Sequence, residues 1–181
     1  MKTTILWGLI TTGLILGLVG CLRNDVITHR LETDLIEKPT FYIGEFRDGL
    51  PADFPAHKKP TARDISIFIS ALKEALYENR FAGEVSVANP GGKDYEITGA
   101  ILDYKRGDGF LRFFSLGHVG RAKATMKLEL RNMQTKDIIF AGIFGGYIVN
   151  WDRAGDEMYS EVSKAFVKAL RKEIRKIRWG K

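Results

Sequence analysis

The feature that most constrains the fold is a strict alternation over residues 121–131. Polar or charged side chains occupy every second position, and apolar side chains stand between them: Ala122, Ala124, Met126, Leu128 and Leu130. Because successive strand residues point to opposite faces of a sheet, this pattern predicts a strand with one buried face. Its charged face is left toward water or a partner. The segment NMQTKD then predicts a hairpin turn, and residues 138–149 return as an antiparallel strand.

Two helical patterns supply the partners for the buried face of that hairpin. Thr61 and Asp64 resemble a capping box, and the apolar residues of 65–76 follow helical spacing until Gly83 ends the helix. A second apolar face at helical spacing runs from about Gly155 to Arg178. Residues 40–46, 84–88 and 95–106 are rich in β-branched and aromatic residues and predict strands.

The element order is therefore β-α-β-β-β-β-α over residues 39–181, with a further short strand possible within 26–31. It predicts an α+β fold, an α/β sandwich in which two helices pack on one mixed, largely antiparallel sheet of about five strands. The chain has 181 residues, which suits one domain. Its formal net charge of +6 favours an anionic partner such as phospholipid or another acidic polymer, and serves equally well as a solubility feature.

The N-terminus has the shape of a secretory leader. Lys2 gives a positive start, residues 5–19 form an apolar core interrupted only by threonines and glycines, and the stretch closes as Leu18-Val19-Gly20-Cys21. This closing stretch resembles the lipobox of bacterial lipoproteins. The resemblance implies cleavage between Gly20 and Cys21 and attachment of a diacylglycerol to the Cys21 sulfur. Cys21 is the only cysteine, so no disulfide competes for it.

The chain then divides into a leader at 1–20, a lipidated tether at 21–38 and one domain at 39–181. A buried cysteine beside an uncleaved membrane anchor is the alternative. Two or three acyl chains would hold the protein stably on a membrane, whereas a single chain is marginal. Leu22 follows the cysteine, and the absence of an Asp there resembles lipoproteins sorted to the outer membrane. We therefore expect a lipid-anchored domain on the periplasmic face of the outer membrane.

A family resemblance rests on residues 97–107 and 117–142, in which a strand, a glycine-bearing junction and a charged hairpin follow one another. This arrangement resembles a family of bacterial lipoproteins classed as a domain of unknown function. The turn Gln134-Thr135-Lys136-Asp137 lacks the glycine of that family's turn. The topology over 39–177 is also similar to the periplasmic domain of the curli-secretion lipoprotein CsgG and to the peptidoglycan-synthase activator LpoB. Fold analogy does not transfer function.

Catalytic and metal-binding patterns are not found in the sequence. The three histidines lie far apart, no serine stands in a GxSxG elbow, and no phosphate-binding glycine loop occurs. We therefore expect no cofactor, no resident metal and no catalytic residues. An envelope location also makes nucleic acid an implausible partner.

Two segments are candidates for binding. The first spans 107–120 and is crowded with large apolar residues between glycines: Phe110, Leu111, Phe113 and Phe114. An exposed apolar patch there would contact a protein or a membrane, although the same residues alternate like a strand that completes the core. The second is the basic side of the last helix: Lys164, Lys168, Arg171, Lys172, Arg175 and Lys176. The helix dipole accounts for the last few cations, and docking on phospholipid or an acidic partner accounts for the row as a whole.

Taken together, the sequence predicts a membrane-anchored, non-catalytic accessory module of an envelope complex, with an envelope protein as partner. The oligomeric state is left open. The alternatives are an envelope hydrolase or cell-wall-modifying enzyme, which would need clustered carboxylates in a cleft, and a lipid or glycan carrier, which would need a deep apolar cavity.

Overall fold

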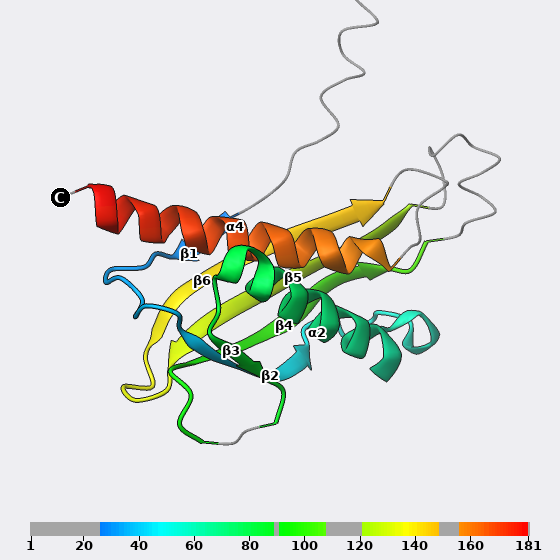
Figure 1. Ribbon diagram of the computed structural model, residues 1–181. Helices are drawn as coiled ribbons and strands as arrows, with labels where there is room; N and C mark the ends of the chain where they lie inside the picture. The colour runs from blue at the N-terminus through cyan, green and yellow to red at the C-terminus, as the bar shows by residue number, and fades with distance from the viewer. Residues whose placement is uncertain (1–25, 89–90, 108–120, 149–155, 181) are drawn as a thin grey trace, which may run out of the picture.

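The computed structural model describes residues 26–88, 91–107, 121–148 and 156–180. Six strands form one sheet in the order β1-β6-β5-β4-β2-β3 (Figure 1). The strands are β1 (Val26–His29), β2 (Thr40–Asp48), β3 (Glu84–Ser86), β4 (Tyr95–Lys105), β5 (Ala122–Asn132) and β6 (Ile138–Ile148). The helices are α2 (Ala62–Tyr77) and α4 (Glu157–Trp179), with short 3-10 turns η1 (Ala56–Lys58) and η2 (Glu78–Arg80).

The sheet is mixed, as the sequence predicts. β2 runs parallel to both β3 and β4, whereas the pairs β4–β5, β5–β6 and β6–β1 are antiparallel. The α+β fold class is confirmed, and the sheet has one strand more than the expected five. The additional strand, β1, lies within the short strand anticipated at 26–31 and pairs along the edge of β6.

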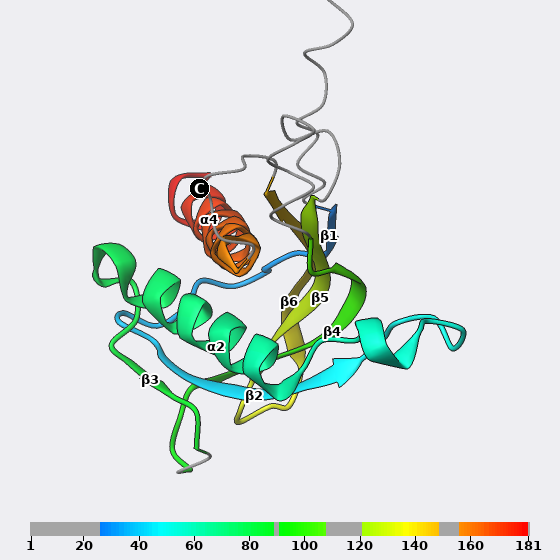
Figure 2. The same ribbon diagram turned by 90° about the vertical axis from the view of Figure 1, so that its right-hand side faces the viewer.

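Both helices pack on the same face of the sheet, with α4 over β5 and β6 and α2 beside it (Figure 2). The alternation of β5 is confirmed, because its five apolar residues from Ala122 to Leu130 are all buried. The rings of Phe140 and Phe144 meet Phe166 of α4 at centroid distances of 5.8 and 5.4 Å. Neither of the two described α-helices covers the opposite face of the sheet.

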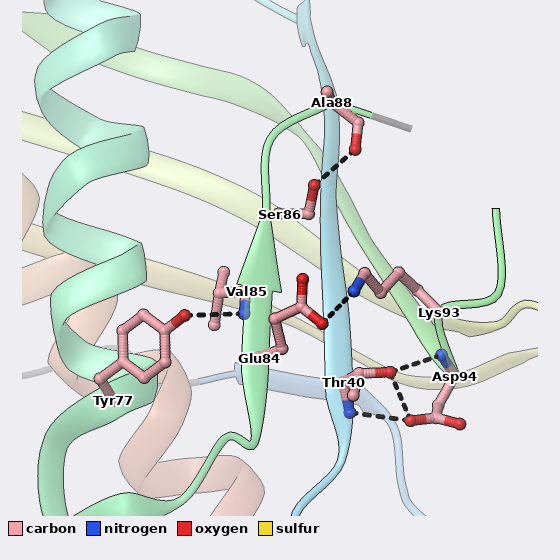
Figure 3. A network of polar contacts seen from close by, with 8 residues as sticks. All are labelled: Thr40, Tyr77, Glu84, Val85, Ser86, Ala88, Lys93 and Asp94. Carbon is pink, nitrogen blue, oxygen red and sulfur yellow. Dashed lines mark hydrogen bonds and ion pairs between the residues drawn. The ribbon is translucent and has the colours of Figure 1, made fainter. Parts of the chain in front are cut away.

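The parallel side of the sheet is fastened by a polar network (Figure 3). The Asp94 carboxylate accepts hydrogen bonds from the backbone N–H of Thr40 at 2.8 Å and from its hydroxyl at 2.5 Å. Lys93 forms an ion pair with Glu84 of β3. The Tyr77 hydroxyl of α2 accepts a hydrogen bond from a backbone N–H of β3 at 3.0 Å. The Lys93 and Tyr77 contacts hold the short edge strand β3 in register, where few backbone pairs are available, and the Asp94 contacts join the start of β2 to the start of β4.

The segment expected to be a tether, residues 21–38, is docked on the domain from Val26 onward. Leu31 and Leu35 are buried in the core, and Asp34 forms an ion pair with Arg178 near the end of α4. The reason is that both leucines have an apolar surface within reach, which outweighs the polar residues around them. In the sequence, residues 22–25 stand between Cys21 and the first described strand.

Gly146 lets α4 approach β6 closely. A Cβ at Gly146 would lie 2.1 Å from the carbonyl oxygen of Met158, whereas at Gly145 the nearest atom, the Thr125 hydroxyl oxygen, is 3.9 Å away. We expect Gly146→Ala to lower the free energy of unfolding by about 1–3 kcal/mol, because a backbone atom cannot yield easily. Gly145→Ala, on the open face, is the matched control and should be neutral or stabilise by up to about 1 kcal/mol. Urea unfolding of both variants tests this, and equal effects would contradict it.

The predicted capping box at the start of α2 is present. The Asp64 carboxylate accepts hydrogen bonds from the Thr61 backbone N–H at 2.7 Å and hydroxyl at 2.6 Å, while the Asp64 backbone N–H donates to the Thr61 hydroxyl oxygen. Burial raises the pKa of the Asp64 carboxyl, but these hydrogen bonds outweigh burial and bring the pKa below its ordinary value. The charged carboxylate is therefore the form that the fold favours.

This shift makes the stability depend on pH in a defined direction. Because the folded pKa is lowered, the stabilisation is present above the unfolded pKa of about 3.9 and is lost as pH falls through the folded pKa. We expect Asp64→Asn to reduce stability by about 1 kcal/mol near neutral pH, as for loss of a cap. The difference from the wild type should shrink below pH 4. Denaturant unfolding across pH measures it, and a difference that grows on acidification would refute the assignment.

Candidate functional site

The basic side of α4 is exposed because the helix buries its opposite side. Its apolar residues, such as Val162, Phe166 and Leu170, face the sheet, which leaves positions 164, 168, 172 and 175 on the outer surface. From Lys164 to Arg178 the only carboxylate of the helix is Glu173, which is buried. The exposed side of the helix is therefore uniformly cationic over this range.

Three of the cations at this end of α4 are engaged within the protein. Lys176 forms an ion pair with Glu173 at 2.5 Å, and Arg178 pairs with Asp34, which holds the pKa of its guanidinium above the ordinary value. Arg171 donates a hydrogen bond to the carbonyl oxygen of Glu78 at 2.9 Å, and its guanidinium carbon lies 5.2 Å from the centroid of the Phe81 ring. These side chains brace α4 against its neighbours. The sequence groups Lys176 with the other cations of the helix, but in the structure its charge is already paired with Glu173.

The other cations have no such use within the described chain. Lys164, Lys168 and Lys172 are exposed, as is Arg175, and none makes a hydrogen bond or ion pair with another described residue. We call these four residues, with Arg171 at their edge, the basic face of α4. Their charges are available to something outside the domain.

Two neighbouring hollows follow the basic face. One, of about 410 Å³, is lined by the basic face together with Glu78 and Val167. The other, of about 810 Å³, lies between the 35–39 segment, the end of η2 and the last turns of α4. Arg171 and Arg175 line both hollows, so the two are adjacent. Basic residues outnumber Glu37, the one carboxylate of the larger hollow: Lys38, Arg80, Arg171, Arg175 and Arg178.

Large apolar side chains stand at the open end of the larger hollow. Trp179 is 84% exposed and Ile36 is 49% exposed, and both line it. Neither residue is among the binding candidates predicted from the sequence. Trp179 at the end of a cationic helix was the available signal, whereas Ile36 becomes noteworthy only once the 30–38 segment is seen beside α4.

The open face of the sheet is different in charge. A hollow of about 520 Å³ lies over its centre, with Thr98, Gly99 and Ala100 among the residues that line it. Three carboxylates and three cations also line this hollow: Glu45, Glu96, Glu129, Arg47, Lys127 and Arg131. Lys127 pairs with Glu129 at 2.7 Å, and Arg131 lies 4.0 Å from Glu96. The charged face predicted from β5 is thus a mixed, nearly balanced surface.

A group of buried hydroxyls lies between the sheet and the first turns of α4. Tyr104, Tyr159 and Ser163 have hydroxyl oxygens with no hydrogen-bond partner in the described part of the chain. Burial raises the pKa of both tyrosines, so they stay protonated at neutral pH. Because these hydroxyls are inaccessible, we assign them no chemical role. Sequence patterns place them as ordinary core positions of a strand and a helix.

Several predicted residues fall outside the described ranges. They are the lipidation residues Gly20 and Cys21 and the apolar residues Phe110, Leu111, Phe113 and Phe114, so their roles stay predictions. Among described residues, no group of three His, Cys, Asp or Glu side chains is placed to hold a metal ion. None of the described helices combines the length and apolar character needed to span a bilayer.

Comparison with known proteins identifies the fold. The sequence matches no family model and no curated protein. The structure is similar to a dodecamer of PelC from Paraburkholderia phytofirmans, with a TM-score of 0.53 and 11% identity over 81% of this chain and 97% of that one. The chain shares its fold with PelC. A second PelC crystal structure gives a TM-score of 0.51 at 10% identity, over 81% of this chain and 96% of that one.

A DUF330 protein from Xanthomonas campestris matches with a TM-score of 0.41 at 9% identity, over 85% of this chain and 94% of that one. Identities at this level show the fold alone. The likeness to PelC therefore supports the arrangement of helices and strands and assigns no functional site. The CsgG-like and LpoB-like topology stays a prediction.

The basic face should cost the domain stability. Lys168 stands four residues from both Lys164 and Lys172, and like charges at this spacing destabilise a helix by about 0.2–0.5 kcal/mol per pair. We expect Lys168→Glu to raise the free energy of unfolding by about 1 kcal/mol at low ionic strength, since it turns both repulsions into attractions. The gain should shrink in high salt. Urea unfolding at two salt concentrations measures it.

Lys73→Glu on α2 is the matched control. The residues three and four positions away from Lys73 carry no charge: Ile69, Ser70, Leu76 and Tyr77. This control should stay within about 0.5 kcal/mol of the wild type. If Lys168→Glu destabilised the domain, the basic face would be part of what holds the fold together.

Proposed function

We propose that this chain is a lipid-anchored protein of the bacterial envelope that works by binding, as a non-catalytic accessory module of an envelope complex. Anchoring is through Cys21 after removal of residues 1–20, and the location is the periplasmic face of the outer membrane. The open face of the sheet is the surface that meets the protein partner.

The observation that carries this proposal is the one-sided packing of the helices. Since α2 and α4 cover the same face, the other face of the six-stranded sheet is open among the described residues and has a hollow over it. Three carboxylates and three cations surround that hollow, so it offers both hydrogen-bond donors and acceptors. Such a surface suits a polar protein contact, in which complementary charges fix the partner and its orientation.

Two further observations support the proposal. The segment Leu18-Val19-Gly20-Cys21 resembles a lipobox, and the folded body begins at Val26, so the domain would sit close to its anchor. The neighbour PelC is a dodecamer, which supports a second copy of this chain as one form that the partner takes.

A crosslinking experiment in the native bacterium tests the proposal. A photo-reactive amino acid at position 127, in the open-face hollow, should give defined adducts with an envelope protein or with a second copy of the chain. The same group at Lys73, an exposed lysine of α2, is the control and should give none of them. Cys21→Ser should abolish the adducts, because the chain then lacks its lipid. Mass spectrometry of the wild type should find a diacylglyceryl group on Cys21 and no leader.

Identical adducts from both positions would refute the open face as the binding surface. Adducts that persist in Cys21→Ser, or an unmodified sulfur in the wild type, would refute the lipid-anchored role.

A further inference from the structure

We propose that the basic face of α4 docks on the anionic phospholipid head groups of the membrane that holds the anchor. The inference rests on the lipid anchor of the proposed function for its place in the cell, and it names the partner of a surface that the proposed function leaves unused.

The arrangement of charge is the first argument. Lys164, Lys168, Lys172 and Arg175 span twelve residues, or about 16 Å of helix, on one exposed side. A row of this length can meet several head groups at once when the helix lies along the membrane plane. The apolar side of α4 is already buried in the core, so phosphate contacts and not deep insertion must provide most of the binding.

The absence of acidic partners is the second argument. These four cations make no ion pair among the described residues, and they repel one another along the helix. Two carboxylates near the end of α4 are already occupied, since Glu173 pairs with Lys176 and Asp34 pairs with Arg178. An external anionic surface would relieve the repulsion, and each basic residue close to such a surface adds to the attraction.

The third argument is that the two hollows give the basic face recessed sites, which a flat row of lysines would not have. Arg171 is held in place by the carbonyl oxygen of Glu78 and the Phe81 ring, so its position is fixed before any ligand arrives. Arg175 lies one turn further along the helix, and both arginines line the two adjacent hollows. A pair of guanidinium groups at the edge of a hollow suits a phosphate, because arginine can donate two parallel hydrogen bonds.

The apolar side chains at one end fit the same occupant. Trp179 and Ile36 are exposed beside the larger hollow, next to cations and not within an apolar patch. Tryptophan rings prefer the head-group level of a bilayer, where an apolar ring and a polar N–H both find partners. An acidic protein would account for the cations but would give no special reason for an exposed indole.

The short distance between the anchor and the domain keeps the basic face of α4 near the membrane that holds the anchor. Cys21 is five residues from Val26, so the folded body begins within about 17 Å of the lipidated residue. β1 and α4 both pack against β6, and both lie at the same end of the molecule in Figure 2, opposite β2 and β3. A body held there cannot carry α4 far from the head groups.

Vesicle binding by the unlipidated chain tests the inference. The core residues run from Leu31 to Ile174, and β1 begins at Val26, so residues 22–181 contain every described strand, helix and core residue. This chain should bind phosphatidylcholine vesicles containing about one third phosphatidylglycerol at least tenfold more tightly than pure phosphatidylcholine vesicles. High salt should weaken the binding. With Trp151→Phe in the same chain, Trp179 is its single tryptophan. The fluorescence emission of Trp179 should then shift to the blue when the anionic vesicles are added.

Matched charge reversals locate the surface. Lys164→Glu with Lys168→Glu should weaken binding about tenfold or more, whereas Lys58→Glu with Lys105→Glu, with the same charge change on η1 and β4, should change it less than threefold. Equal binding to both vesicle types, or equal loss in both double variants, would overturn the inference. So would capture of an acidic protein through α4 by a chain that ignores vesicles. Because the assay uses no lipid on Cys21, its failure leaves the anchored role standing, and an unmodified Cys21 leaves the vesicle result standing.

Discussion

The close approach of α4 to β6 at Gly146 is the contact on which the rest of the surface depends. A side chain at that position would run into the carbonyl oxygen of Met158, so a glycine there allows the first turn of α4 to sit on the sheet. Ala124, the cross-strand neighbour of Gly146, is also small and buried. Once the helix is seated at this end, its 3.6-residue period decides which positions meet the core and which meet solvent. The cationic row is outward because Phe166 and Leu170 are inward.

A charged helix face is usually a solvated surface, and two observations separate this one from that ordinary case. The same helix does pair its cations where carboxylates are near, as Lys176 does with Glu173 and Arg178 with Asp34. Glu161 stands three residues before Lys164, but Lys168, Lys172 and Arg175 meet only like charges at the spacing where opposite charges would stabilise the helix. A local choice that works against helix stability points to a use outside the domain.

The regular part of the fold could be predicted from the sequence, and the reason is that periodicity reports burial directly. The alternation of β5 and the capping box at Thr61 each depend on residues a few positions apart, and both are confirmed. The docking of Leu31 and Leu35 could not be predicted, because it depends on a groove made by segments more than a hundred residues away. The same limit applies to the site. The cationic row is visible in the sequence, but the bracing of Arg171 by Phe81 and Glu78 appears only when η2 is placed beside α4.

The fold itself does not choose between the two polar surfaces, because 11% identity to PelC fixes the arrangement of elements and not the residues on them. The distribution of charge does distinguish the surface that suits a membrane from the one that does not. The open-face hollow has equal numbers of acids and bases around it and would be nearly indifferent to an anionic membrane, while the basic face of α4 would be strongly attracted. In a tethered domain the basic face of α4 would therefore turn to the bilayer, and the open face of the sheet would stay available to a protein. Orientation beside the membrane then follows from electrostatics, with the tether supplying only proximity.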